Sequence, residues 1–135
     1  MPLETGYYLI QNQGKFLGAS TEEPLVPRRI IVLPGGVEAP KFFVEKFGEN
    51  RYAITIDNAR TRPIEDKVFA ITVVGPPPEL WHIKADGGED SYIVETTERA
   101  RGWISPNEPY GQIMCRELVV TPSYEAFQFI PAPDN

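Results

Sequence analysis

The sequence predicts an all-β fold, and three observations lead to that prediction. Proline and glycine are frequent in the 135 residues (14 Pro and 11 Gly), and they separate short apolar runs from one another. Within the runs, apolar and aromatic residues recur at every second position, which is the spacing of a strand with one buried face. A strand start of the form Tyr-x-Ile or Tyr-x-Val recurs at Tyr8, Tyr52 and Tyr92, which are 44 and then 40 residues apart. This period indicates three similar units.

Each unit contains four candidate strands. They span residues 7–12, 15–19, 30–33 and 42–47, then 52–57, 61–66, 68–74 and 80–85, then 92–97, 102–105, 113–120 and 126–130. The stretch 61–66 is the weakest candidate because it is polar. Twelve short strands in three groups of four predict a β-trefoil, a single domain over residues 1–135 in which six strands close a barrel and three hairpins cap it. Another β-sandwich or barrel is the alternative, and we expect little or no helix.

The last strand of each unit repeats a second pattern, an aromatic residue followed two positions later by an apolar one. It reads FFV at 42–44, WHI at 81–83 and FQF at 127–129. We expect these alternating side chains, like those of the Tyr-x-Ile starts, to fill the barrel. Turn signals separate the strands: QG at 13–14, PGG at 34–36, GEN at 48–50, GPPP at 75–78, DGG at 86–88 and PN at 106–107.

Composition argues against several classes of protein. The net charge is −6, whereas a nucleic-acid-binding protein needs a basic face. No run of 18 apolar residues is present, so we expect no membrane partner. The N-terminal residues lack the features of a secretory signal, and the single cysteine, Cys115, has no partner for an internal disulfide; both favour a cytoplasmic protein. We expect no metal or other cofactor, because His and Cys are not clustered and a phosphate-binding glycine loop is missing.

Residues 21–29 form the candidate functional loop. Pro24 and Pro27 frame a Leu-Val pair, Arg28 and Arg29 follow, and an apolar run begins at Ile30. Proline fixes its own φ and biases the preceding residue towards extended conformations, so the loop loses less entropy when a partner binds it. A stiff, extended segment with an exposed arginine is a substrate-like ligand for a trypsin-like protease. A solvated turn is the alternative interpretation.

The chain resembles the mycospins, the β-trefoil serine protease inhibitors of mushrooms. The resemblance is carried by residues 3–10 (LETGYYLI), 14–18 (GKFLG), 39–45 (APKFFVE) and 127–129 (FQF), and it covers the whole chain. It implies a fungal trypsin inhibitor with a defensive or regulatory role rather than an enzyme. It also implies that the reactive residue lies on the loop between the second and third strands, which is the loop at 21–29.

The residues then suggest a mechanism. A trypsin-like enzyme has a buried aspartate in its primary pocket, and a guanidinium can bind it with directional, charge-assisted hydrogen bonds. We expect Arg28 to enter this pocket, with the Arg28–Arg29 bond across the catalytic serine; entry of Arg29, with the Arg29–Ile30 bond there, is the second choice. The remaining contacts would come from the residues just before the arginines, Leu25, Val26 and Pro27. We expect the inhibitor to act as a monomer.

Two other functions remain open at this point. A carbohydrate-binding lectin is one, but the Gln-x-Trp repeat of ricin-type trefoils is missing, and we expect Trp81 and Trp103 in the core. Inhibition of cysteine or legumain-type proteases through another loop is the second; the resemblance to the related mushroom cysteine protease inhibitors implies Asn58 as the residue presented, and an ordinary turn asparagine is the alternative there. We expect His82, the only histidine, at the surface and Cys115 to be a buried structural thiol.

Overall fold

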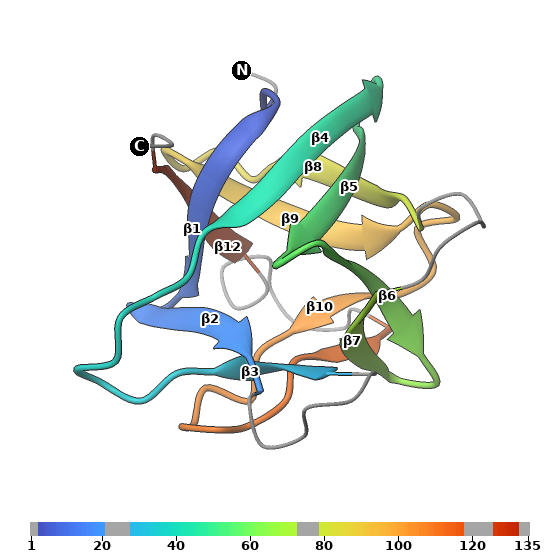
Figure 1. Ribbon diagram of the computed structural model, residues 1–135. Coiled ribbons are helices and arrows are strands. Elements are labelled where there is room, and N and C mark those ends of the chain that lie inside the picture. Colours follow the sequence, from blue (N-terminus) through green and yellow to red (C-terminus); the bar gives the residue numbers. More distant parts are fainter. Residues whose placement is uncertain (1–2, 21–27, 73–78, 118–125, 133–135) are drawn as a thin grey trace.

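The computed structural model describes residues 3–20, 28–72, 79–117 and 126–132, and these residues form twelve strands (Figure 1). The strands of the first unit are β1 (Gly6–Asn12), β2 (Lys15–Ala19), β3 (Arg28–Val32) and β4 (Phe42–Gly48). Those of the second are β5 (Arg51–Ile56), β6 (Ala59–Ile64), β7 (Lys67–Ile71) and β8 (Trp81–Ala85). Those of the third are β9 (Ser91–Thr96), β10 (Gly102–Ile104), β11 (Met114–Arg116) and β12 (Ala126–Pro131). Twelve strands are present as predicted, the polar one at β6 included, but β11 is shorter than the stretch predicted at 113–120, of which residues 118–120 lie outside the described residues.

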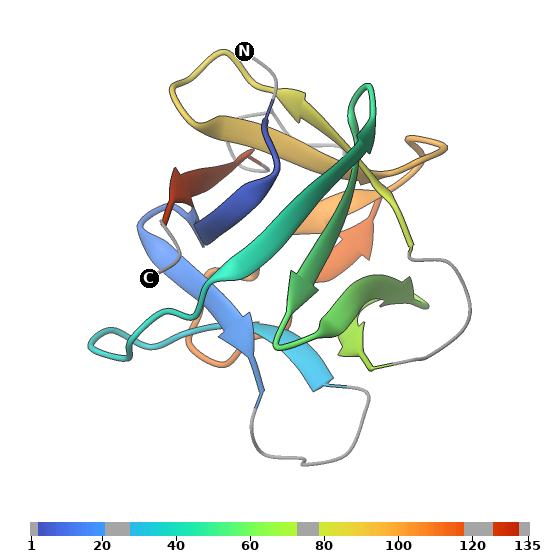
Figure 2. The same ribbon diagram turned by 45° about the horizontal axis from the view of Figure 1, so that its top comes forward.

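Six strands close into a barrel. Neighbouring strands pair antiparallel in the cyclic order β1–β4–β5–β8–β9–β12, and β12 returns to β1. Closure leaves the barrel without a free edge, which protects it from strand addition. The second strand of each unit continues from the barrel into a hairpin, so that β2–β3, β6–β7 and β10–β11 cover one end. Figure 2 shows the barrel above these hairpins. The arrangement is the predicted β-trefoil.

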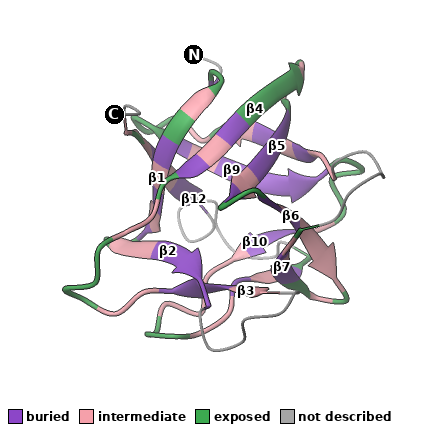
Figure 3. Cartoon of the chain, viewed as in Figure 1, coloured by how far each residue is buried: buried purple, intermediate pink, exposed green. Residues whose placement is uncertain are grey.

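The barrel interior is filled by the alternating side chains that the sequence singled out. Tyr8, Ile10, Tyr52, Ile54 and Val94 are buried on the Tyr-x-Ile/Val strands. The aromatic-x-apolar strands contribute Phe42, Val44, Trp81, Ile83, Phe127 and Phe129. Figure 3 shows the burial alternating along β1 and β4. Because successive strand residues point to opposite faces, a pattern of period two in sequence becomes one continuous core.

Backbone hydrogen bonds join the three capping hairpins to one another. β3 pairs with β7, and β7 with β11. The amide of Ile113 donates to the carbonyl of Ile30 at 2.8 Å, and the amide of Val68 donates to the carbonyl of Ile113 at 3.0 Å. The cap is therefore a hydrogen-bonded ring, and it fixes the start of β3 against β7.

The structure corrects two expectations about single residues. β3 begins at Arg28 rather than at residue 30, because its ladder with β7 extends further than its apolar run. His82 is not a simple surface residue: its side chain is only 16% exposed and lies beside Glu95. The part of the chain that the structure describes contains no helix that could cross a membrane.

Candidate functional site

The predicted loop connects β2 with β3 at the capped end of the molecule. Of the predicted site residues, Leu25, Val26 and Pro27 lie outside the described residues. Arg28 and Arg29 are the first residues of β3, and Ile30, the third, is fully buried in the core. The structure therefore places both arginines where this connection joins the capping hairpin.

The backbone of both arginines is held in the sheet. Arg28 and Arg29 lie opposite Ala70 and Phe69 of β7. On the other side, the amide of Ser20 donates to the carbonyl of Arg29 at 2.8 Å. The prediction that both arginines belong to the loop itself is therefore wrong, since they belong to the strand that follows it.

The Arg28 side chain, at the start of β3, contacts both Ser20, just after β2, and Asp57 in a neighbouring turn. Its Nε donates to the carbonyl oxygen of Ser20 at 3.0 Å. Its Nη1 lies 3.4 Å from Oδ2 of Asp57, in the turn between β5 and β6. The Arg28 side chain is 21% exposed and that of Asp57 is 65% exposed. The ion pair is therefore close to water, where such pairs are weak.

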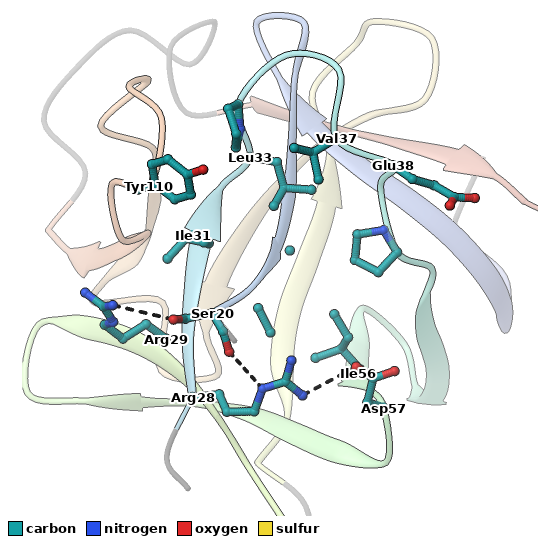
Figure 4. Close-up of a pocket in the computed structure, with 14 residues that line it drawn as sticks. Ser20, Arg28, Arg29, Ile31, Leu33, Val37, Glu38, Ile56, Asp57 and Tyr110 are labelled. Carbon is teal, nitrogen blue, oxygen red and sulfur yellow. Dashed lines mark hydrogen bonds and ion pairs between the residues drawn. The ribbon is translucent and has the colours of Figure 1, made fainter. Parts of the chain in front are cut away.

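Arg29 reaches the same serine from a different direction. Its Nη2 lies 3.5 Å from Oγ of Ser20. Ser20 is buried. Its carbonyl oxygen contacts the Arg28 guanidinium, and its Oγ contacts the Arg29 guanidinium. Figure 4 shows the two arginines on either side of Ser20. Two cationic side chains thus meet at one buried position at the base of the connection.

The turn that carries Asp57 has a fixed geometry. Asp57 and Asn58 both have positive φ, 51° and 64°, and they form a two-residue connection between β5 and β6. Two consecutive residues of this kind are typical of a type I′ hairpin, in which Asn and Asp are favoured. The turn holds the Asp57 carboxylate beside Arg28. Asn58, the residue considered for legumain-type inhibition, is exposed in this same turn.

A pocket of about 370 Å³ opens beside the arginines. Its apolar lining includes Ile31 of β3, Leu33 and Val37 of the following connection, and Ile56 of β5. Its polar lining includes Ser20, Arg28, Arg29, Glu38, Asp57 and Tyr110. Figure 4 shows the arginines and Asp57 along one part of the pocket, with Leu33, Val37 and Tyr110 along another.

A cluster of charged groups on β8, on β9 and just after β9 was missed by sequence reasoning. The Glu95 carboxylate is almost buried, and its Oε1 lies 3.3 Å from Nδ1 of His82 and 3.8 Å from Nζ of Lys84. Nε of Arg99 lies 3.6 Å from the same oxygen. His82 and Glu95 are cross-strand neighbours, a relation that becomes visible only when the register is known. Lys84 and Arg99 bring positive charge to this carboxylate, so the cluster is best explained as balancing a buried charge.

The tryptophans and the cysteine belong to the core, as predicted. Trp81 and Trp103 are fully buried and pack edge to face, with ring centroids 5.3 Å apart. Neither ring is therefore available to stack on a sugar. Cys115 is also fully buried, and burial raises the pKa of its thiol from 9.0 to about 11. A thiol in this environment stays protonated and unreactive near neutral pH.

Comparison with known proteins identifies the family. Residues 1–130 match the profile of the peptidase inhibitor I66 family. The chain belongs to this family. A serine protease inhibitor of Lentinula edodes is 34% identical to this I66 protein over 126 residues, which cover 90% of this chain and 87% of that one. The I66 chain is therefore a peptidase inhibitor and not an enzyme.

Solved structures similar to the I66 chain agree with the fold. A proteinase inhibitor from Coprinopsis cinerea superposes with a TM-score of 0.82 at 24% identity, covering 97% of this chain and all of that one (100%). The designed threefold-symmetric protein ThreeFoil gives 0.76 at 13% identity, with 94% and 99% coverage. A ricin B-like lectin of Macrolepiota procera, in complex with lactose, gives 0.75 at 13% identity, with 98% and 99% coverage. At these identities the likeness shows the shared trefoil and carries no function with it.

Proposed function

We propose that this I66 chain inhibits trypsin-like serine proteases by presenting an arginine where the connection between β2 and β3 ends. Family membership carries the step to peptidase inhibition, and the similarity to the Lentinula edodes protein supports serine proteases as the targets. The step to trypsin-like enzymes rests on the two consecutive arginines at the start of β3. The reactive segment in this proposal consists of Leu25, Val26, Pro27, Arg28, Arg29 and Ile30.

The entering residue in this proposal is Arg28, with Arg29 as the second choice. In the free inhibitor, the Arg28 guanidinium has the Ser20 carbonyl and the Asp57 carboxylate as partners. Entry into the protease pocket exchanges this exposed ion pair for a buried one with the protease aspartate. The exchange is favourable because charge-assisted bonds to a desolvated carboxylate are stronger than bonds to an exposed one.

The frame around the reactive segment supports slow hydrolysis. The Arg29 carbonyl is bound by the Ser20 amide, and both arginines lie in the ladder with β7. After attack at the Arg28–Arg29 bond, these contacts keep the new amine near the acyl group, so religation competes with hydrolysis. A segment held at both ends also loses less entropy on binding. We propose that one monomer binds one protease.

The deciding experiment compares single charge reversals in a trypsin inhibition assay. Arg28→Glu should raise Ki at least about thirtyfold if Arg28 enters the pocket, because truncating one partner of a buried charge pair costs on the order of 2–5 kcal/mol. Arg29→Glu should have a smaller effect. Arg51→Glu is the matched control, because Arg51 is exposed at the far end of β5 from Asp57. Unchanged inhibition by the Arg28→Glu, Arg29→Glu double variant would overturn the proposal.

A further inference from the structure

The pocket beside the arginines has an apolar floor that depends on a glycine. A Cβ added at Gly18 would lie 2.9 Å from Cδ2 and 3.1 Å from Cδ1 of Leu33. The absence of a side chain at Gly18 therefore lets Leu33 lie flat against β2 and leaves the pocket open. A volume of about 370 Å³ is large enough for the side chain of a partner, since sites for small ligands begin near 300 Å³.

Tyr110 is held at the rim of this pocket in an unfavourable backbone conformation. Its φ is 66°, in the left-handed region that aromatic residues rarely adopt. Its amide donates to the carbonyl of Val32 at 2.7 Å, and the amide of Val32 donates to the carbonyl of Gly111 at 2.9 Å. The side chain is nevertheless 65% exposed, so the free protein gains little burial from this placement. A strained residue fixed in this way is a candidate for contact with a partner.

Part of the exposed apolar surface of the described residues lies at this pocket. Among the described residues, the large apolar side chains that are exposed are Tyr7, Val37, Phe47 and Tyr110. Val37 and Tyr110 both line this pocket. Arg28 and Arg29 line it too, so the apolar face is continuous with the proposed reactive segment.

The size of a stable protein–protein interface indicates that the reactive segment needs neighbouring surface to complete it. A stable protein–protein interface takes roughly 20–30 residues and about 800 Å² from each partner. The reactive segment 21–29 supplies only a third or so of that number. The rest must come from neighbouring surface, and the pocket and its rim adjoin the arginines directly.

We propose that this pocket is a second contact region for the target protease, and this inference rests on the proposed function. One apolar side chain from the protease surface enters between Leu33 and Ile56, while Val37 and Tyr110 pack around it. An apolar group fits here because Leu33 and Ile56 belong to the apolar part of the lining, which adjoins the charged Arg28, Arg29, Glu38 and Asp57. The reactive arginine then determines which class of protease binds, and the pocket selects among members of that class.

Tyr110→Asn tests the inference without disturbing the backbone, because asparagine tolerates a positive φ better than most residues. We expect the Ki for trypsin to rise about tenfold, mainly through faster dissociation, as interface substitutions usually act. Phe47→Asn is the matched control: Phe47 is an aromatic residue with similar exposure, 51%, but lies on β4 outside the pocket lining. It should change Ki less than twofold.

Gly18→Ala provides a second variant that adds no group to the surface. The new Cβ displaces the flexible end of Leu33 into the pocket, so we expect weaker inhibition with an almost unchanged unfolding midpoint. If the double arginine variant abolishes inhibition while Tyr110→Asn and Gly18→Ala both inhibit like wild type, the pocket inference is wrong and the proposed function stands. If the double arginine variant still inhibits, the proposed function itself fails. Self-association of the wild type that Tyr110→Asn removes would assign the pocket to a second copy of the chain and overturn the inference.

Discussion

Arg28 is the residue whose surroundings decide how the inhibitor would work. It begins a strand, and its guanidinium lies between a backbone carbonyl and an exposed carboxylate. These contacts can be interpreted in two ways. Either Asp57 holds the arginine only until a protease carboxylate replaces it, or Asp57 and Ser20 fix Arg28 as a structural support for Arg29. Removing the Asp57 charge separates the two interpretations.

Asp57→Asn should therefore make the inhibitor associate faster with trypsin. If Arg28 enters the protease, losing its resting partner raises the association rate with trypsin by at most about fivefold, because exposed ion pairs contribute about 0.2–1 kcal/mol. Stopped-flow measurement of inhibition would show the change. Glu38→Gln is the control, because it removes one negative charge from the same pocket without touching the pair. Slower or weaker inhibition by Asp57→Asn would assign Arg28 a supporting role and make Arg29 the entering residue.

Cys115 should make the protein less stable at alkaline pH. Its pKa is about 11 in the folded state against an ordinary 9.0, because burial disfavours the thiolate. The folded state thus holds the proton more tightly, so this stabilisation is complete below pH 9 and is lost as the pH rises towards 11. Between pH 8 and pH 10, the free energy of unfolding should fall by about 1 kcal/mol.

Urea unfolding at these two pH values checks this expectation, and Cys115→Ala serves as the control. The variant is less stable overall, but its stability should change less between pH 8 and pH 10. Burial also raises the pKa values of Tyr8, Tyr52 and Tyr92 above 10.0, so these groups begin to lower the free energy of unfolding near pH 10, and they do so in both proteins. Equal pH dependence in wild type and variant would contradict the assignment to Cys115.

At the scale of elements, the sequence predicted the strands well because each depends on local alternation. Residues 42–44 and 127–129 show why: one aromatic-x-apolar triplet is enough to mark a strand and its buried face. The start of β3 was predicted too late because Arg28 and Arg29 carry no apolar signal, and their place in the ladder comes from β7, some 40 residues away. Local periodicity does not reveal which distant strands pair with each other.

The surroundings of the candidate site were hidden from the sequence for the same reason. The arginines themselves could be singled out, because prolines and charge marked their segment. Asp57 and Tyr110 could not be singled out in this way. Asp57 lies in the turn between β5 and β6 and Tyr110 lies between β10 and β11, and both come near the arginines only in the folded cap. The strained backbone of Tyr110 likewise depends on backbone hydrogen bonds to β3, which no pattern in the sequence predicts.

Thr61 on β6 joins three strands through one hydroxyl group. Its Oγ1 donates to the carbonyl of Ile54 on β5 at 2.7 Å and accepts from Nε1 of Trp81 on β8 at 2.9 Å. Thr61→Val keeps the shape but leaves two buried polar groups without a partner, so it should lower the free energy of unfolding by about 2–3 kcal/mol. Thr61→Ser, which keeps the hydroxyl, should lose less than half of that in the same urea titration. Equal losses would show that packing rather than hydrogen bonding matters at this position.

For the whole molecule, the closed barrel explains how a trefoil could hold a reactive segment without disulfides. β1 pairs with β2, β4 and β12, and β2 pairs with β3. The strands β1 and β2, which precede the reactive segment in the chain, are therefore bound to the rest of the molecule by strand pairing on several sides. Ile10 and Leu17, both fully buried, add apolar contacts worth about 1.5–3 kcal/mol each.

The cleaved inhibitor should consequently stay assembled. Hydrolysis at the Arg28–Arg29 bond would divide the 135 residues into chains of 28 and 107, and the shorter chain would keep β1 and β2 in their ladders. Size-exclusion chromatography without denaturant should show one species of the intact size, while denaturing mass spectrometry of the same peak shows two chains. The Arg28→Glu, Arg29→Glu double variant should remain a single chain under the same treatment with trypsin. Separation of the two chains in native buffer would show that the frame cannot hold the new ends together, and religation could then not account for inhibition.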